Sequence, residues 1–469
     1  MKTFNTKPAR RLANVGVDPP MSTSLTNGSR VGIIGAGPAG SFFAFFMLKM
    51  AESVGLELSV DLYEPRLFAH HGPAGCNHCG GIISESLVQL LATEGIDLPP
   101  GVVQRGIESY VLHTDVGVVR IDTPTQEKRI AAVYRCNGPR QSEAMEIAGF
   151  DGYLLELARA RGANVVRKLV TGFDLQAGRP RIRTADGTTQ VYDLVAVAAG
   201  VNSQILETVG AAAGQSRQPG MLRAFISEFH LGAQVIADSL GDSMHVFLLD
   251  LPRLEFAALI PKGEFVTLCL LGDDVDPPLV EEFLATPEVR KCFPQGLVPT
   301  PVCHCLPRIN VRAAQRPFAD RIVWIGDCGV SRLFKDGIGS AYRTAKSAAR
   351  TAVFVGVSQA DFQHGFWPEC RKLIIDNMIA RLIFAVTKLI QRLRFVRRGV
   401  VRMTAQEQSQ TDGARVLSSV LWDVFTGSAP YKEILLRTMH PVFPFRLMWN
   451  LAAGNIDRTE KHLFVGRWS

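Results

Sequence analysis

The chain has 469 residues, of which 47% are apolar and 20% charged, and its formal net charge is +7. This length and apolar content exclude a largely disordered polymer and allow two or three domains, each with its own core. The positive charge favours an anionic partner, either nucleic acid or an anionic membrane surface. Nine cysteines without the dense spacing of a secreted disulfide scaffold indicate a reducing, cytoplasmic compartment.

Residues 1–30 are predicted to form a disordered tail. They lack the apolar stretch of a secretory signal, and their charged side chains are four bases and one acid before position 30, namely Lys2, Lys7, Arg10, Arg11 and Asp18. A true start at Met21 accounts for this composition equally, and an organelle transit peptide accounts for it less well. No uninterrupted apolar run in the chain reaches the roughly 18 residues of a membrane-spanning helix.

A nucleotide-binding unit is predicted directly after this tail. A buried strand at 31–34 runs into Gly35-Ala36-Gly37-Pro38-Ala39-Gly40, a helix over 41–50, and a strand over 58–63 that ends at Glu64. Gly35 permits the tight turn, Gly37 lets the backbone approach a pyrophosphate, and Gly40 lets helix and strand pack closely. The helix N-terminus attracts phosphates. Glu64 can accept hydrogen bonds from ribose hydroxyls and would repel the 2′-phosphate of NADP.

Two later segments favour FAD over NAD. A buried strand over 192–200 ends at Gly200, and a strand over 321–327 ends in Gly326-Asp327, before Gly337-Ile338-Gly339 and an Ala-rich helix over 340–353. This order resembles the two-dinucleotide-binding flavoproteins and, more narrowly, the p-hydroxybenzoate hydroxylase-like fold. The resemblance implies that Asp327 holds the ribityl chain of FAD or its phosphate region. It also implies that Gly337 and Ile338 lie beside the isoalloxazine ring.

The segment 72–84 narrows the family. Cys79-Gly80 follows a proline and precedes a helix over 85–93 that Ser84 can cap. This pattern resembles the geranylgeranyl reductase family, whose members place such a Cys-Gly stretch against the flavin. The helix that begins at Phe150-Asp151 carries the F-D-x-x-L pattern of the same family. An arginine before this helix touches FAD there, and the resemblance gives this role first to Arg140 and second to Arg135.

The resemblance also implies a reaction. Reduced FAD would deliver hydride to an isolated alkene, which requires a proton donor and a dry apolar pocket. Cys79 or His78 is the predicted catalytic donor, and packing of Cys79 against the ring is an equal alternative. The stretch Phe256-Ala257-Ala258-Leu259-Ile260-Pro261 stands where the family has a Y-x-W-x-F-P strand along a lipid tunnel, but Ala258 and Ile260 replace two of its aromatic residues. No second dinucleotide motif identifies the electron donor, which could be NADPH or ferredoxin.

Two close cysteine pairs, Cys76/Cys79 and Cys303/Cys305, stand apart from these motifs. Four thiolates in two pairs could hold a zinc ion or an iron–sulfur cluster. The first pair alone could be a redox dithiol. Because C-x-C is a less usual half-site than C-x-x-C, unconnected buried thiols are the favoured interpretation, and no metal is predicted.

The region 366–403 is predicted to form one long or two shorter amphipathic helices. It carries nine basic residues against two acids, Glu369 and Asp376. Such a helix suits an anionic bilayer surface, where apolar side chains insert and basic ones meet head groups. A helix packed on the protein's own core with a solvated basic face accounts for the pattern as well. If the substrate is a lipid, an anionic membrane surface is the favoured partner of this region. Nucleic acid is disfavoured as a partner because the sequence contains no nucleic-acid-binding motif.

These observations predict an α/β fold with a Rossmann-type FAD-binding domain, an interleaved antiparallel-sheet substrate domain and a helical C-terminal region. The FAD domain is assigned to 31–100, 136–210 and 318–355, the substrate domain to 101–135 and 211–317, and the helical region to 356–469. The predicted function is reduction of double bonds in a geranylgeranyl-type isoprenoid chain on a lipid or quinone, by a protein peripheral at the membrane. The alternatives are a flavin monooxygenase that uses NADPH and O2 on an aromatic or polyketide substrate, and a flavoprotein that passes electrons to quinone.

Overall fold

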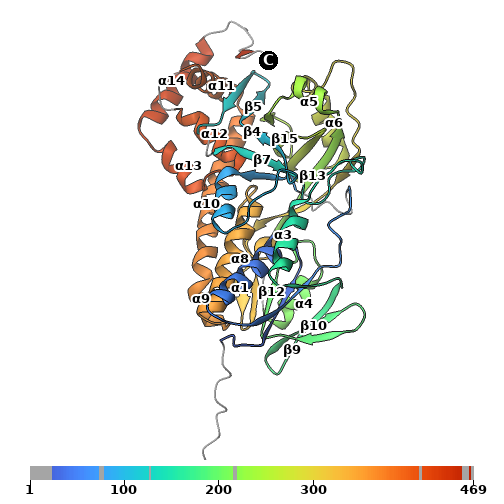
Figure 1. Cartoon of the computed structure of the whole chain (residues 1–469). Helices are drawn as coiled ribbons and strands as arrows, with labels where there is room; N and C mark the ends of the chain where they lie inside the picture. The colour runs from blue at the N-terminus through green and yellow to red at the C-terminus, as the bar shows by residue number, and fades with distance from the viewer. Residues whose placement is uncertain are drawn as a thin grey trace, which may run out of the picture.

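The computed structural model describes residues 24–72, 79–125, 128–214, 219–410, 415–456 and 464–465. Cys76 and His78, two of the predicted site residues, lie outside these ranges, as do residues 1–23. Figure 1 shows the chain as two lobes, one above the other, with helix α10 (Trp367–Arg392) running along one side. The remaining C-terminal helices gather beside the upper lobe.

The lower lobe is built on a six-stranded sheet in the order β19-β20-β12-β1-β2-β8. All its pairings are parallel except β19–β20. Because parallel sheets are covered on both faces, their central strands are rich in buried apolar residues, as Val31 to Ile34 of β1 and Leu194 to Val197 of β12 illustrate. The strands are β1 (Ser29–Ile34), β2 (Leu58–Tyr63), β8 (Asn164–Val166), β12 (Leu194–Val197), β19 (Phe318–Ala319) and β20 (Ile322–Trp324).

Helices and a small sheet cover the two faces of this sheet. One core cluster joins the central strands to α1 (Pro38–Ser53), α3 (Phe150–Ala160) and α8 (Gly337–Phe354), with α9 (Gln359–Gly365) behind α8. Another cluster joins the opposite face to α4 (Ile205–Ala212) and to a three-stranded antiparallel sheet. That sheet consists of β9 (Val170–Gln176), β10 (Arg179–Thr184) and β11 (Thr189–Val191).

The glycines of the first turn explain how β1 and α1 fit together. Gly35 has a φ of +99°, which other residues rarely adopt. A Cβ on Gly40 would lie 1.9 Å from the Gly35 carbonyl oxygen, so only glycine allows the helix to pass this close to the turn. The helix begins at Pro38, three residues before the predicted start, because proline's fixed φ suits the first helical position.

The upper lobe is a nine-stranded sheet that runs β17-β13-β16-β15-β14-β5-β6-β21, with β18 paired to β13. Its pairings are antiparallel except β14–β5 and β21–β6. The strands are β5 (Ser109–Thr114), β6 (Gly117–Asp122), β13 (Gly220–His230), β14 (Ser243–Phe247), β15 (Leu254–Lys262), β16 (Phe265–Gly272), β17 (Cys303–Cys305), β18 (Arg308–Arg312) and β21 (Phe464–Val465). On one face lie α5 (Ala233–Ser239), α6 (Pro277–Ala285) and α7 (Pro287–Arg290).

A second small sheet, β3-β7-β4, connects the lobes. Its strands are β3 (Ile82–Ser84), β4 (Val103–Ile107) and β7 (Ile130–Val133). β3 leads into α2 (Glu85–Thr93), whose first turn is capped as predicted, since the Ser84 hydroxyl accepts the Leu87 N–H at 3.3 Å. β3 and β7 pair directly, although the sequence analysis assigned β3 to the FAD domain and β7 to the substrate domain.

The helical C-terminal region packs into both lobes. α10 and α11 (Arg394–Ser409) are separated at Leu393, whose backbone is extended, so the predicted amphipathic segment forms two helices. α11 and α12 (Val416–Thr426) enter the core of the upper sheet through residues such as Val400 and Trp422. α13 (Tyr431–Thr438) and α14 (Val442–Ile456) follow. None of the helices in the described ranges is both long and apolar enough to cross a bilayer.

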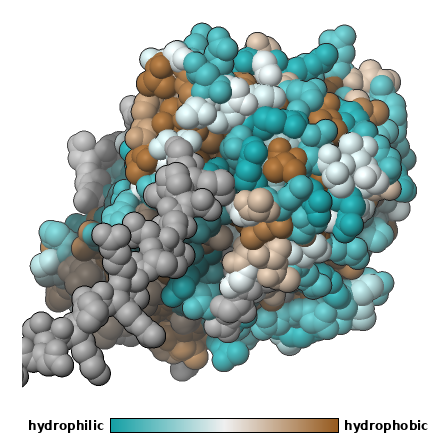
Figure 2. Space-filling model, turned by 90° about the horizontal axis from the view of Figure 1, so that it is seen from below, coloured by the Kyte–Doolittle hydropathy of each residue, from teal (hydrophilic) through white to brown (hydrophobic). Residues whose placement is uncertain are grey.

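Exposed apolar side chains are unevenly distributed over the surface. Figure 2 shows the lower face of the molecule, where hydrophilic residues dominate and apolar ones form small separate areas. On α10, five apolar residues that are each 49–64% exposed recur at helical spacing: Ile375, Met378, Leu382, Val386 and Leu389. We call these five residues the α10 stripe. Further exposed apolar side chains lie on α13 and α14: Leu436, Met439, Val442, Phe445, Met448 and Trp449.

The predicted α/β class is confirmed. A Rossmann-type lobe is interleaved with a mostly antiparallel sheet, and helices make up the C-terminal region. The two lobes meet where the carboxyl ends of β1, β2 and β12 open toward the upper sheet, which is the usual place for a ligand in an open α/β sheet.

Candidate functional site

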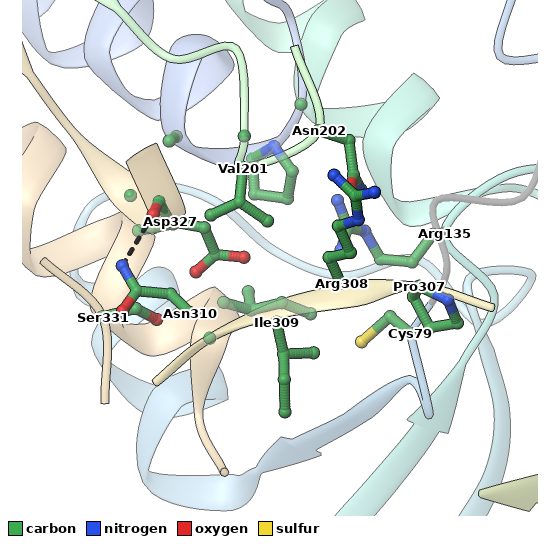
Figure 3. Close-up of a pocket in the computed structure, with 18 of the residues that line it drawn as sticks. Cys79, Arg135, Val201, Asn202, Pro307, Arg308, Ile309, Asn310, Asp327 and Ser331 are labelled. Carbon is green, nitrogen blue, oxygen red and sulfur yellow. Dashed lines mark hydrogen bonds between the residues drawn. The ribbon is translucent and has the colours of Figure 1, made fainter. Parts of the chain in front are cut away.

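A cavity of about 610 Å³ lies between the two lobes. The lower lobe contributes the turn after β1, the end of β2 and the segment after β12, from Ala198 to Ser203. The upper lobe contributes β13 to β16 and the start of β18. Figure 3 shows side chains from these separate elements around one space, with the β18 segment crossing it. The site therefore has one wall of glycines and polar groups and another of apolar strand residues.

The polar wall begins with the predicted nucleotide motif. Gly35, Gly37, Ala39 and Glu64 all line the cavity. A Cβ on Gly37 would meet only the Arg135 guanidinium, at 3.9 Å from Nη2, so glycine leaves room there for a ligand beside a positive charge. This arrangement fits a pyrophosphate at the N-terminus of α1. Gly40 does not line the cavity, and its role is the close packing of α1 described above.

Glu64 is buried at the end of β2. Its carboxylate accepts the Ala36 N–H at 3.2 Å and the Arg66 Nε–H at 3.0 Å. These contacts fix the carboxylate at the cavity wall, and a carboxylate has further lone pairs for hydroxyl donors. The ribose role predicted for Glu64 is compatible with this position.

Of the two arginines proposed from the sequence, Arg135 lines the cavity and Arg140 does not. The Phe150 and Asp151 N–H groups each donate at 2.9 Å to the carbonyls of Tyr134 and Arg135, which brings position 135 to the start of α3. The Arg135 guanidinium then makes a two-pronged ion pair with the buried Asp151 carboxylate. Arg140 does not line the cavity, and its side chain lies against Gly72. The first choice from sequence, Arg140, therefore does not reach the cavity, because the intervening loop makes spacing along the chain a poor guide.

Asp327 lies on the opposite side of the cavity, in the turn after β20. Burial raises the pKa of its carboxyl, while a hydrogen bond with Ser331 and the charge of Arg135 oppose this rise. The Asn310 amide donates to the Asp327 backbone carbonyl at 2.7 Å and fixes the turn (Figure 3). A partly buried carboxylate aimed into a cavity is suited to ligand hydroxyls. Gly200, Gly337 and Ile338, the other predicted contacts, line the same cavity.

Two cysteines face the junction of the polar and apolar walls. Cys79 and Gly80 line the cavity, and the Cys79 Sγ accepts the Gly81 N–H at 3.3 Å. Cys269 on β16 lies against this loop, since a Cβ on Gly80 would be 3.3 Å from its Sγ. Burial, helped by Cys79, raises the pKa of Cys269 to about 12, so it remains a thiol at neutral pH. Cys269 was not among the site residues predicted from the sequence.

The four-cysteine cluster, the less favoured interpretation of the two cysteine pairs, is not assembled by the described part of the chain. Cys303 and Cys305 lie on β17 and do not line the main cavity. Among the described residues, they and Cys79 do not form a group close enough to share a metal ion. Cys76, the fourth member, lies outside the described residues.

Sequence reasoning also missed Lys335, which precedes the Gly337-Ile338-Gly339 motif. Lys335 lines the cavity, donates to the Asp423 backbone carbonyl at 2.6 Å and lies 3.9 Å from the centre of the Tyr431 ring. Burial, and secondarily Arg332, lowers its pKa to about 7. Its position two residues before Gly337 could have indicated that it lies at the site. Nothing in the sequence around Asn310 indicates that this residue lines the cavity.

The apolar wall consists of side chains from the upper sheet: Ile226, Met244, Phe256, Ala258, Ile260 and Leu271. Phe256, Ala258 and Ile260 alternate along β15 and all reach the cavity, as expected for one face of a strand. These are the three positions at which the geranylgeranyl reductase family, by the resemblance described above, has aromatic residues. Because these positions hold Phe256, Ala258 and Ile260, the wall is apolar but less bulky than a strand with Tyr, Trp and Phe at the same positions would be.

No protein-family model and no curated protein matches this chain. Many solved structures share its fold, among them the following three. A flavoprotein/dehydrogenase from Cytophaga hutchinsonii has a TM-score of 0.60 and 14% identity, covering 91% of this chain and all of that one. A geranylgeranyl bacteriochlorophyll reductase-like protein from Thermoplasma acidophilum has a TM-score of 0.59 and 15% identity, covering 92% and 100%. A mutant of the halogenase PltM in complex with FAD has a TM-score of 0.57 and 13% identity, covering 92% of each.

These similarities establish the FAD-binding flavoprotein fold, which oxidoreductases and halogenases share. The predicted cofactor is FAD, and the cavity agrees with it through the small residues at the first turn, the acid after β2 and Asp327 at the cavity wall. At such low identity the fold does not distinguish among the reactions that its members perform.

Proposed function

We propose that this protein is a FAD-dependent reductase that hydrogenates carbon–carbon double bonds in a geranylgeranyl-type isoprenoid chain carried by a lipid or quinone. The observation that carries the proposal is the apolar wall opposite the nucleotide motif. Its six side chains carry no charge, so an isoprenoid chain would be desolvated against them favourably. The Cys-Gly stretch at Cys79 adds support, because it lies at the same cavity.

Each part of the cavity has a role in this proposal. Gly37, Glu64, Arg135 and Asp327 would hold FAD, which supplies hydride when reduced. The apolar strands would position the alkene and exclude water. Cys79 would donate the proton that completes hydrogenation, and Cys269 stands beside it as a second thiol.

The α10 stripe supports delivery of such a substrate from a membrane. Its five apolar residues lie on the solvent side of α10, opposite the buried Cys370, Leu373 and Phe384. Arg371 stands four residues before the stripe and Arg392 three after it, so both continue the same helical face. We therefore propose that α10 lies on an anionic membrane surface, with the stripe inserted and the arginines at head groups.

Internal contacts reduce the charge that is available for this surface. Arg397 pairs with Asp115 at 2.5 Å, and Lys388 pairs with Glu255. The nine basic residues counted in the sequence are therefore not equivalent, and apolar insertion carries more of the proposed binding than charge does.

A flavin monooxygenase or halogenase is the second candidate, favoured by the halogenase among the structures of the same fold. It would act with O2 and add oxygen or halogen to its substrate. Electron transfer to quinone is a third candidate, but it has less support, since the described cysteines do not assemble a cluster site.

The test is anaerobic incubation of the dithionite-reduced protein with geranylgeranylated lipids, followed by mass spectrometry of the lipid extract. Dithionite makes the result independent of whether the natural donor is NADPH or ferredoxin. Products heavier in steps of two hydrogens are expected. An unchanged lipid mass, together with NADPH-dependent oxygen consumption, would replace this proposal with the monooxygenase candidate.

A further inference from the structure

A second group of reactive side chains lies in the upper lobe, away from the flavin cavity. His113 is on β5, His245 is on β14, and Cys292 follows α7. All three are buried, and none of them lines the cavity. β5, near the top of the molecule in Figure 1, pairs in parallel with β14, and the two imidazoles stack on each other.

The spacing of their ligand atoms is that of a metal centre. His113 Nε2 lies 2.9 Å from His245 Nδ1, and Cys292 Sγ lies 3.4 Å from His245 Nδ1 and 3.8 Å from His113 Nε2. Tetrahedral coordination with metal–nitrogen bonds of about 2.0 Å and metal–sulfur bonds of about 2.3 Å separates two nitrogens by roughly 3.3 Å and nitrogen from sulfur by roughly 3.5 Å. Shifts of a few tenths of an ångström would convert one arrangement into the other.

The second nitrogen of His245 is also arranged as in a ligating imidazole. Its Nε2 lies 3.2 Å from the Leu240 carbonyl oxygen and can donate its proton there. This contact leaves the Nδ1 lone pair directed at Cys292 and His113. A carbonyl that holds the outer N–H of a histidine is the usual support of a metal ligand.

The surroundings favour a soft or borderline ion. Phe247 stacks on His113, and the apolar cluster that contains Cys292 excludes carboxylates from the centre. Burial lowers the pKa of both imidazoles, that of His245 to about 4, so both rings are neutral at neutral pH. Neutral imidazoles and a thiolate are ligands for Zn²⁺ or Cu⁺ and not for Mg²⁺ or Ca²⁺.

We propose that His113, His245 and Cys292 bind one thiophilic d¹⁰ metal ion, Zn²⁺ or Cu⁺, which links the strand pair β5–β14 to the segment after α7. On binding, the Cys292 S–H bond breaks, the proton passes to water, and a metal–sulfur bond forms without any change of oxidation state. The site is structural, because it joins three chain segments and does not open into the flavin cavity.

The decisive measurement is metal content of the FAD-loaded wild-type protein, purified with Zn²⁺ or, under reducing anaerobic conditions, with Cu⁺. About one equivalent of one ion is expected, and the two preparations identify which. Titration of the demetallated protein with Co²⁺ should produce thiolate-to-cobalt absorption that saturates at about one equivalent. If the wild-type protein retains neither ion and gives no such absorption, the three residues form only a hydrogen-bonded group and the proposal is wrong.

Variants then locate the ion. Cys292→Ser and His245→Gln should each lower metal content at least tenfold, whereas Cys370→Ser, a matched buried cysteine in the lower lobe, should retain it. FAD absorbance confirms that each variant is folded. If a variant does not fold, the wild-type cobalt titration still decides. Metal bound equally by Cys292→Ser and His245→Gln would place the ion elsewhere and overturn the assignment.

Discussion

At the scale of single residues, Cys79 and Cys269 face the same cavity from different elements. Cys79 is held in a loop by the Gly81 N–H, and Cys269 is fixed in a strand. A thiol can donate a proton to a carbon centre only where water is excluded and the alkene is held close to sulfur. The junction between the polar and apolar walls meets both conditions if an isoprenoid chain lies along β15.

Cys79→Ser should leave FAD bound and slow alkene reduction at least about 100-fold, the lower end of the usual range for loss of a general acid. The measurement is the single-turnover rate with dithionite-reduced protein and a geranylgeranylated lipid. Cys305→Ser, which alters a cysteine outside the cavity, should keep the wild-type rate. A wild-type rate in Cys79→Ser would remove Cys79 from the mechanism.

Lys335 makes stability depend on pH. Its folded pKa of about 7 lies below the ordinary lysine value of 10.5 because of burial, so the unfolded chain binds more protons between these values. The lysine's contribution to the free energy of unfolding should therefore rise from pH 7 to pH 10, by up to about 1.4 kcal/mol per pH unit. Below pH 7 Lys335 is protonated in the folded protein, and burial of its charge lowers the free energy of unfolding by the full amount.

Lys335→Met should remove this slope, and urea unfolding at several pH values from 6 to 10 measures it. The matched control is Lys432→Met, an exposed lysine on α13, which should keep the wild-type slope. Parallel pH profiles for the wild type and Lys335→Met would contradict the assignment of the slope to Lys335.

At the scale of elements, α10 has apolar residues on two faces. One face joins the cores of both the lower lobe and the C-terminal helices through Leu373 and Phe384. The other face is the α10 stripe. α10 therefore packs on the protein's own core and also exposes the α10 stripe beside its basic residues.

Met378→Glu combined with Leu382→Glu should lower binding to vesicles that contain anionic phospholipid at least tenfold, because two inserted side chains are replaced by charges that anionic lipids repel. Co-sedimentation with the vesicles measures this. The control adds the same two charges at Leu169→Glu and Val298→Glu, exposed apolar sites away from α10. Equal loss in both proteins would show that total charge, not the stripe, governs binding.

At the scale of the whole molecule, the cavity is lined by both lobes, so a cofactor bound there stabilises their junction. The polar wall comes from segments around β1, β2 and β20, and β13–β16 close the other side. FAD should therefore raise the thermal stability of the entire chain. At a free concentration 100 times its dissociation constant, the gain is about 2.7 kcal/mol.

Gly37→Val should abolish this stabilisation, because the added side chain would project into the space beside Arg135. Differential scanning calorimetry with and without FAD measures it. In the control, Gly106→Val in β4, a Cβ meets no atom within 4 Å and the response to FAD should persist. A full FAD response in Gly37→Val would contradict the placement of the cofactor at this turn.

Much of the lower lobe was predictable because its signals are local. The positive φ at Gly35, the close approach at Gly40 and the apolar run of β1 depend on residues only a few positions apart. The sequence by itself therefore determined the first strand–helix–strand unit, the acid that follows it and the cap at Ser84.

Contacts between distant segments required the tertiary structure. Arg135 reaches the cavity because backbone hydrogen bonds tie it to Asp151, a fact that spacing along the chain does not contain. Cys269 and Asn310 enter the site through strand pairing in the upper sheet. His113 and His245 meet because β5 and β14 pair in parallel across 132 residues. Such pairings are set by the packing of whole elements, so no local pattern in the sequence determines them.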